Sequence, residues 1–171
     1  MEEEVLAALA ALYREVDEET ARLGEIHGER IRCARNCTSC CVDGITVFEI
    51  EAERIRRSCA ALLREGAPHE PGMCAFLDQE GACRIYENRP YVCRTQGYPL
   101  RWVVEEDGSL VERRDICPLN EEGPPVESLP SDQCWTLGPV EGKLASLQAA
   151  FQGNPRARPL RRIPLRDLFP R

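Results

Sequence analysis

The nine residues CARNCTSCC, at positions 33–41, constrain this chain more than any other stretch. Four of them are cysteines, in the spacing C-x3-C-x2-C-C, and the 171-residue chain carries ten cysteines in all. Thiols gathered this densely pair as disulfides, carry out redox chemistry or ligate a metal. The rest of the sequence has to discriminate among these three uses.

The spacing of the cysteines favours metal ligation. Thiolates must converge on one ion at about 2.3 Å, and C-x2-C lets two sulfurs point inward together. Zinc takes four such ligands in a tetrahedron, and an iron–sulfur cubane also takes four thiolates. The adjacent Cys40 and Cys41 are harder to place on one ion, because neighbouring side chains usually diverge. They indicate two centres, or one centre and a spare thiol.

Three alternatives are less favoured. Disulfide frameworks belong to exported proteins, but the first residues, MEEEVLAALAALYREV, lack the basic and apolar regions of a signal peptide. A thioredoxin-like site places its C-x2-C at a helix N-terminus within a βαβ unit, whereas Cys37-Thr38-Ser39-Cys40 precedes a predicted short strand. Cuprous ion binds thiolates well, but its sites rarely use so many dispersed cysteines.

Composition and charge argue against several classes of partner. No apolar run approaches the roughly 18 residues needed to cross a bilayer, so we expect a cytoplasmic protein with no membrane contact. The net charge of −7 argues against nucleic acid, which needs a basic face. The exception is the tail at 154–171, with six arginines against one aspartate. We expect it to be a solvated, extended arm that would fit the acidic first helix or an acidic partner.

Apolar periodicity predicts three helices. Apolar residues recur at three- and four-residue intervals through 2–26, 49–65 and 139–152. The β-branched stretch GITVF, at 44–48, predicts a short strand.

Two hairpins are predicted between the second and third of these helices. In 74–86 the polar turn DQEG would place Phe76 opposite Cys83 and Cys74 opposite Ile85, so that two thiols share one face of a small sheet. In 100–113 the dipeptide Asp107-Gly108 is typical of a tight hairpin turn.

The remaining candidate residues are less informative. Cys59 lies on the apolar face of the helix at 49–65, where we expect a core residue, and Cys134 is left open between ligand and core. His27 and His69 are expected to be solvated. Arginines near the cysteines would either be solvated or offset the charge of about −2 that four thiolates leave around a divalent ion. They are Arg32, Arg35, Arg84, Arg94, Arg113 and Arg114.

These residues resemble a known family. The string C-x3-C-x2-C-C, followed by CAFLDQEGACRIYENRPYVCR and a later Cys117-Pro118, is similar to the YkgJ-type CxxCxxCC family over about residues 33–118. Its members are described as candidates for zinc or iron chelation, and relatives are labelled iron–sulfur oxidoreductases or flagellin lysine methylases. The resemblance implies a set of eight metal ligands: Cys33, Cys37, Cys40, Cys41, Cys74, Cys83, Cys93 and Cys117.

We therefore predict an α+β fold. Its small, irregular, metal-stabilised core would contain short β-hairpins and be flanked by a long N-terminal helix and further helices. Residues 1–153 would form one domain, with a helix at 1–30, the cysteine-cluster core at 33–118 and a helix at 139–152, and the tail would follow.

Two hypotheses of function remain open. The first is a structural or accessory protein that holds zinc or an iron–sulfur centre through up to eight thiolates. The second is an iron–sulfur oxidoreductase or electron-transfer protein, or part of a protein-methylation system. No motif in the sequence identifies catalytic residues, and the partner is unknown.

Overall fold

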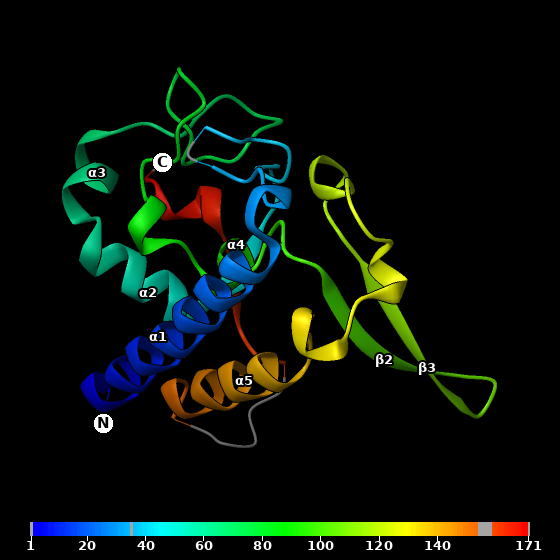
Figure 1. Ribbon diagram of the computed structural model, residues 1–171. Helices are drawn as coiled ribbons and strands as arrows, with labels where there is room; N and C mark the ends of the chain where they lie inside the picture. The colour runs from blue at the N-terminus through cyan, green and yellow to red at the C-terminus, as the bar shows by residue number, and fades with distance from the viewer. Residues whose placement is uncertain (1, 35, 154–158, 171) are drawn as a thin grey trace.

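The computed structural model describes residues 2–34, 36–153 and 159–170 (Figure 1). The fold is α+β, which confirms the predicted class. The helices are α1 (Glu2–His27), α2 (Glu49–Ser58), α3 (Ala60–Glu65), α4 (Tyr91–Arg94) and α5 (Pro139–Phe151), with short 3₁₀ turns between them. The strands are β1 (Thr46–Phe48), β2 (Leu100–Glu106), β3 (Ser109–Asp115), β4 (Trp135–Thr136) and β5 (Arg162–Pro164). No helix in these ranges is long and apolar enough to span a membrane.

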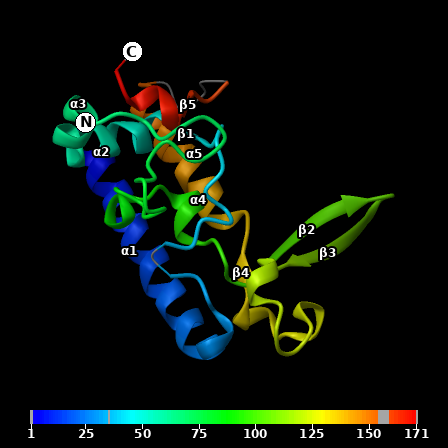
Figure 2. The same ribbon diagram turned by 90° about the horizontal axis from the view of Figure 1, so that it is seen from above.

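The strands form two small sheets. β1 pairs with β5 in antiparallel fashion, and the other sheet has the order β3-β2-β4, with β4 parallel to β2. The hairpin predicted at 100–113 is confirmed as β2 and β3. Its turn has Asp107 at φ 50° and Gly108 at φ 77°. Both values lie in the left-handed region that Asp-Gly hairpin turns require. Figure 2 shows this hairpin projecting away from the helices.

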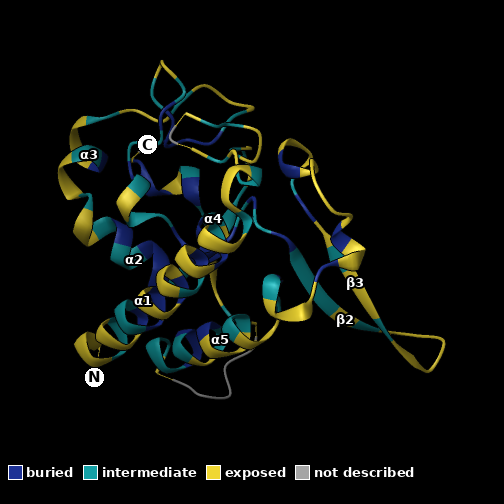
Figure 3. Cartoon of the chain, viewed as in Figure 1, coloured by how far each residue is buried: buried dark blue, intermediate teal, exposed yellow. Residues whose placement is uncertain are grey.

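The first of two main apolar clusters lies where α1 meets α5. Buried and exposed positions alternate along α1 with helical periodicity (Figure 3), and Leu9, Leu12 and Leu23 are almost wholly buried. Their partners include Leu144 of α5 and Trp135 of β4. The helices predicted at 2–26 and 139–152 are thereby confirmed, each to within one residue at its ends.

The second cluster contains the C-terminal tail, which corrects our expectation of a solvated arm. Arg162–Pro164 form strand β5, and Leu165, Leu168 and Phe169 are buried against α2 and the loop around Phe76. The Phe169 and Phe76 ring centroids lie 5.1 Å apart. The six arginines of the tail masked this pattern, because its apolar residues are too few to show a clear period. Residues 154–158 lie outside the described residues.

Two further expectations were partly wrong. The helix predicted at 49–65 is broken at Cys59, whose backbone (φ −121°, ψ 26°) separates α2 from α3. The hairpin predicted at 74–86 has no strands, and its single bridge pairs Leu77, not Phe76, with Cys83. Asp78 explains the difference, because its carboxylate accepts hydrogen bonds from the backbone N–H groups of Glu80 and Ala82. It thereby closes a tight turn that replaces a ladder of paired strands.

A buried carboxylate positions α4 against α1. Glu51, only 3% exposed, accepts hydrogen bonds from the Tyr13 hydroxyl at 2.7 Å and the Tyr91 backbone N–H at 2.9 Å. It also accepts one from the Phe48 N–H at 3.1 Å. Since α4 carries Cys93, this network fixes the place of one candidate ligand.

The buried tail gives the first testable prediction. Phe169→Ala should lower the free energy of unfolding by about 3–5 kcal/mol, because it empties a buried aromatic site. Leu110→Ala is the matched control: Leu110 is 78% exposed on the hairpin, and its truncation should change stability by no more than about 0.5 kcal/mol. Urea denaturation measures both, and equal effects would contradict the packing of the tail.

Candidate metal centre

One cavity, of about 80 Å³, brings most of the predicted ligands together. It lies among the 33–41 loop, the 74–85 loop and α4. Its thiols are those of Cys33, Cys37, Cys40, Cys41, Cys74, Cys83 and Cys93. The eighth predicted ligand, Cys117, is not among the lining residues, although it is close enough to Cys33 to act on it electrostatically. All ten cysteines are free thiols.

The 33–41 loop is made of tight turns. The Cys37 N–H donates to the Ala34 carbonyl at 3.0 Å, and the Cys41 N–H donates to the Thr38 carbonyl at 2.9 Å. Asn36 has φ 77°, a left-handed conformation that Asn tolerates better than most residues. These turns bring all four thiols of the loop to the cavity.

Asn120 ties the start of this loop to the segment after Cys117. Its side chain is fully buried and donates from Nδ2 to the Cys33 Sγ at 3.4 Å and to the Gly97 carbonyl at 2.8 Å. Its Oδ1 accepts the Arg32 backbone N–H at 2.9 Å. The sequence analysis missed Asn120, and no spacing rule would have found an amide donor three residues beyond the last cysteine of the motif.

On the other side of the cavity, the end of the loop pairs with the segment around Cys74. The Cys74 N–H donates to the Cys41 carbonyl at 3.0 Å, and Val42 forms an antiparallel bridge with Met73. Cys83 is brought to the same place by its bridge to Leu77. Cys41 and Cys83 pack with the buried Cys74 in the second apolar cluster.

Burial holds several of these thiols in the protonated form. Burial, together with the neighbouring thiols of Cys74, Cys83 and Cys40, raises the pKa of Cys93 to about 12. Burial also raises the pKa values of Cys33, Cys74 and Cys83. For Cys33, the neighbouring thiols that add to this are Cys37, Cys117 and Cys40. A metal would therefore have to displace protons from the cavity, because thiolates are the ligands.

Cys40 and Cys41 behave oppositely. The pKa of Cys40 is lowered to about 6, mainly by a hydrogen bond from the Cys41 thiol and to a smaller extent by the positive charge of Arg89. The same shared hydrogen bond raises the pKa of Cys41. Among the four cysteines of the loop, Cys40 is the exposed one. Its exposure and lowered pKa make Cys40 a thiol that an incoming cation can reach in the ionised form.

Arg89 is the cation that lies at the cavity, and the sequence analysis did not select it. It is one of the lining residues, and its guanidinium lies 3.7 Å from the centroid of the Tyr86 ring. Its Nη1 donates to the Cys93 carbonyl at 3.5 Å. Arg89 thus supplies positive charge beside the thiols from a side chain anchored by cation–π stacking.

The arginines that we singled out from the sequence serve other contacts. Arg84 donates to the carbonyls of Ala67 and Ala75. Arg94, which is buried, forms an ion pair with Asp17 at 2.6 Å. Arg32 pairs with the exposed Glu122, and Arg113 pairs with Glu106 on the hairpin. Arg35 lies outside the described residues.

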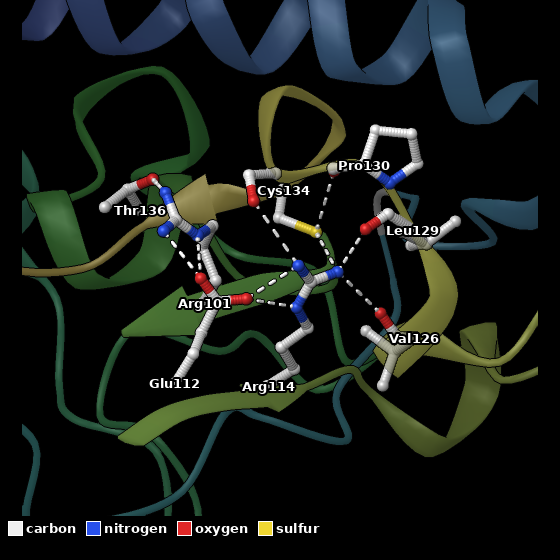
Figure 4. Close-up of polar contacts among 9 residues, drawn as sticks. Arg101, Glu112, Arg114, Val126, Leu129, Pro130, Cys134 and Thr136 are labelled. Atoms are coloured by element: carbon white, nitrogen blue, oxygen red, sulfur yellow. Dashed lines mark hydrogen bonds and ion pairs between the residues drawn. The ribbon is translucent and has the colours of Figure 1, made fainter. Parts of the chain in front are cut away.

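Arg114 and Cys134 belong to a separate cluster where the hairpin meets the segment from Val126 to Cys134 (Figure 4). Arg114 donates to the carbonyls of Val126 and Leu129 and forms an ion pair with Glu112. Cys134 is 4% exposed, packs in a small apolar cluster and donates to the Pro130 carbonyl at 3.7 Å. This answers the question left open from the sequence: Cys134 is a core residue.

The remaining candidate residues from the sequence, Cys59, His27 and His69, also lie outside the cavity. Cys59 is half-buried at the break between α2 and α3 and packs against the second apolar cluster, as expected of a core cysteine. The His27 ring forms a hydrogen bond with the Gln133 carbonyl at 2.7 Å, so it is tied to the protein surface where we expected solvation. His69 is exposed.

The cavity has a suitable donor set for a thiophilic metal, but its side chains are not arranged for coordination. Its metal-binding atoms are all thiols. Within residues 2–34, 36–153 and 159–170, no group of three or more Cys, His, Asp or Glu side chains is arranged to hold an ion. The loops would therefore have to draw together on binding, which is the usual coupling between metal binding and folding.

Comparison with known proteins agrees with this chemistry. A family model described as "CxxCxxCC: Putative zinc- or iron-chelating domain" matches residues 32–118, half of the chain. No curated protein and no solved structure matches. Both Asn120 and the C-terminal strand lie outside the matched range.

The second testable prediction concerns Gly97, where the backbone approaches a thiol. A Cβ at this position would overlap the Cys33 Sγ, so Gly97→Ala must displace that thiol. Gly108→Ala is a matched control, because its φ is also positive (77° against 94° at Gly97) but nothing lies within 4 Å of the added Cβ. Each should lose about 1–2 kcal/mol through left-handed backbone strain. Gly97→Ala should lose a further 1–3 kcal/mol, roughly, through overpacking. Equal losses in urea denaturation would contradict the close approach.

Proposed function

This chain belongs to the CxxCxxCC family, and we propose that it is a metal-binding protein that holds zinc or an iron–sulfur centre through up to eight thiolates. Its role would be structural or accessory. The ligands would be Cys33, Cys37, Cys40, Cys41, Cys74, Cys83, Cys93 and Cys117, and the metal would cross-link loops that are far apart in sequence.

The gathering of seven of these thiols around one cavity carries the proposal. They come from three separate segments, and burial raises the pKa of most of those for which a shift is resolved. Cysteines at these buried positions stabilise the fold less than Val or Leu would, because cysteine is a smaller apolar residue. A bound soft or borderline metal recovers that cost through strong metal–thiolate bonds.

Free thiols also support a cytoplasmic location, which we propose for this protein. Ten unpaired cysteines would be oxidised in the periplasm or outside the cell, whereas the cytoplasm keeps thiols reduced. A metal would protect them further, because a ligated thiolate is a poorer nucleophile than a free one.

A second candidate, an iron–sulfur electron-transfer protein or oxidoreductase, is favoured by the position of Cys40. That thiol is exposed at the cavity, so a cluster bound there would reach the surface, where a redox partner could approach. Solvent exposure is also one of the factors that set the reduction potential of such clusters.

Anaerobic purification of the full-length chain discriminates between the two. A colourless protein with zinc supports the structural or accessory role. A brown protein with iron and acid-labile sulfide supports the iron–sulfur centre. Native protein without any transition metal contradicts the proposal in both forms.

Metal removal gives the third testable prediction. Treatment with a strong chelator under reducing conditions should unfold residues 33–118, because their loops contain little regular hydrogen bonding, while the 26-residue α1 retains part of its helicity. Circular dichroism should show a partial loss of signal and a loss of the cooperative thermal transition. An unchanged melting curve of the metal-free protein would contradict a structural role.

A further inference from the structure

The eight candidate ligands fall into two groups that are held by different parts of the fold. The first group is organised by Asn120, whose side chain donates to the Cys33 Sγ while its backbone N–H donates to the Cys117 carbonyl at 2.8 Å. Its own carbonyl accepts from the Arg30 Nε at 2.8 Å. One buried residue therefore joins two cysteines that are 84 positions apart in the sequence.

The second group is organised by the C-terminal tail. Arg166 donates from Nε to the Asp43 carboxylate at 2.9 Å, two residues after Cys41. It also donates from Nη2 to the Met73 carbonyl at 2.9 Å, one residue before Cys74. A third bond, from Nη1 to the His69 carbonyl at 2.6 Å, fixes the start of the same segment. Arg166 thereby ties the segment that carries Cys41 to the segment that carries Cys74.

The remaining thiols join one group or the other. Cys83 packs with Cys41 and Cys74 in the second apolar cluster. Cys93 enters from α4 and interacts electrostatically most with Cys74 and Cys83, and then with Cys40.

The thiols that interact electrostatically with Cys33 are Cys37, Cys117 and Cys40. The adjacent Cys40 and Cys41 share a hydrogen bond but differ in burial: Cys40 is exposed, whereas Cys41 is partly buried against the second apolar cluster.

We propose that the chain binds metal at two tetrathiolate sites. Site A would use Cys33, Cys37, Cys40 and Cys117, and site B would use Cys41, Cys74, Cys83 and Cys93. This proposal rests on the proposed function, and it adds the number of centres and the ligands of each. Four thiolates per centre match the coordination number of structural zinc and of iron–sulfur cubanes. The split also resolves the geometric conflict at Cys40–Cys41, since each neighbour serves a different centre.

Asn120 and Arg166 become positioning residues of separate sites. Both lie outside the family-matched range of 32–118. Asn120 would orient a ligand of site A directly, through its bond to the Cys33 sulfur. Arg166 would act on site B only through the backbone that carries its ligands.

The fourth testable prediction uses single ligand substitutions in the full-length chain, purified anaerobically. Zinc, iron and sulfide per chain are measured for the wild type, Cys117→Ser and Cys74→Ser. Each substitution should remove half of the wild-type metal and leave the other half bound. Cys134→Ala is the matched control, because it also removes one cysteine but is not one of the eight candidate ligands and packs in a separate apolar cluster, and it should retain the full wild-type content.

Three outcomes are distinguishable. Wild-type protein without metal would overturn the proposed function and the two-site inference together. If the wild type binds metal and either substitution removes all of it, only the two-site inference is overturned, because the result indicates one shared centre. Loss of half with each substitution supports both.

Variants of the positioning residues provide a test that does not remove a ligand. Asn120→Ala and Arg166→Ala are compared by competing bound Zn²⁺ with a chromophoric chelator, which resolves two affinities. Loss of an outer-sphere contact of this kind weakens metal binding by roughly 10–100-fold. Asn120→Ala should weaken one of the two sites and Arg166→Ala the other. Equal weakening of both sites by either substitution would contradict separate sites.

Discussion

The structure around the thiols depends on arginine side chains that donate hydrogen bonds to backbone carbonyls. The loops at 33–42 and 66–90 contain few regular ladders, and buried carbonyls without a partner are costly. Arg84, Arg94 and Arg166 satisfy six of them, two for each arginine, with bonds of 2.6–3.1 Å. A guanidinium suits this task because its planar fork presents five donors. These bonds replace the missing secondary structure.

This arrangement explains how a chain with a small hydrophobic core can hold so many thiols close together. The arginines fix the loop backbones from outside the cavity, Asn120 and Gly97 fix the position of Cys33, and Glu51 fixes the helix that carries Cys93. Positive charge at the cavity itself comes from Arg89. The scaffold thereby brings the ligands near one another, and metal binding would draw their sulfur atoms together into a coordination sphere.

The sequence predicted the elements that depend on local pattern, and it was weaker where tertiary contacts decide. The long helix α1 and the hairpin turn at Asp107-Gly108 follow from periodicity and turn chemistry, and the spacing of the cysteines identified the family. The tail was mistaken for a solvated arm because its arginines dominate its composition, although Leu168 and Phe169 are buried. Asn120 could not be foreseen, since its role exists only when three distant segments meet.

The central claim is that these thiols are gathered in order to ligate metal, and X-ray absorption at the metal edge of the native full-length chain tests it most directly. The account predicts a first shell made of sulfur alone, at about 2.3 Å, with four neighbours for each metal atom if the metal is zinc. An iron–sulfur centre would add metal–metal scattering to the same sulfur shell. A first shell of nitrogen or oxygen at about 2.0–2.1 Å would contradict the claim, because it would place the metal elsewhere in the molecule.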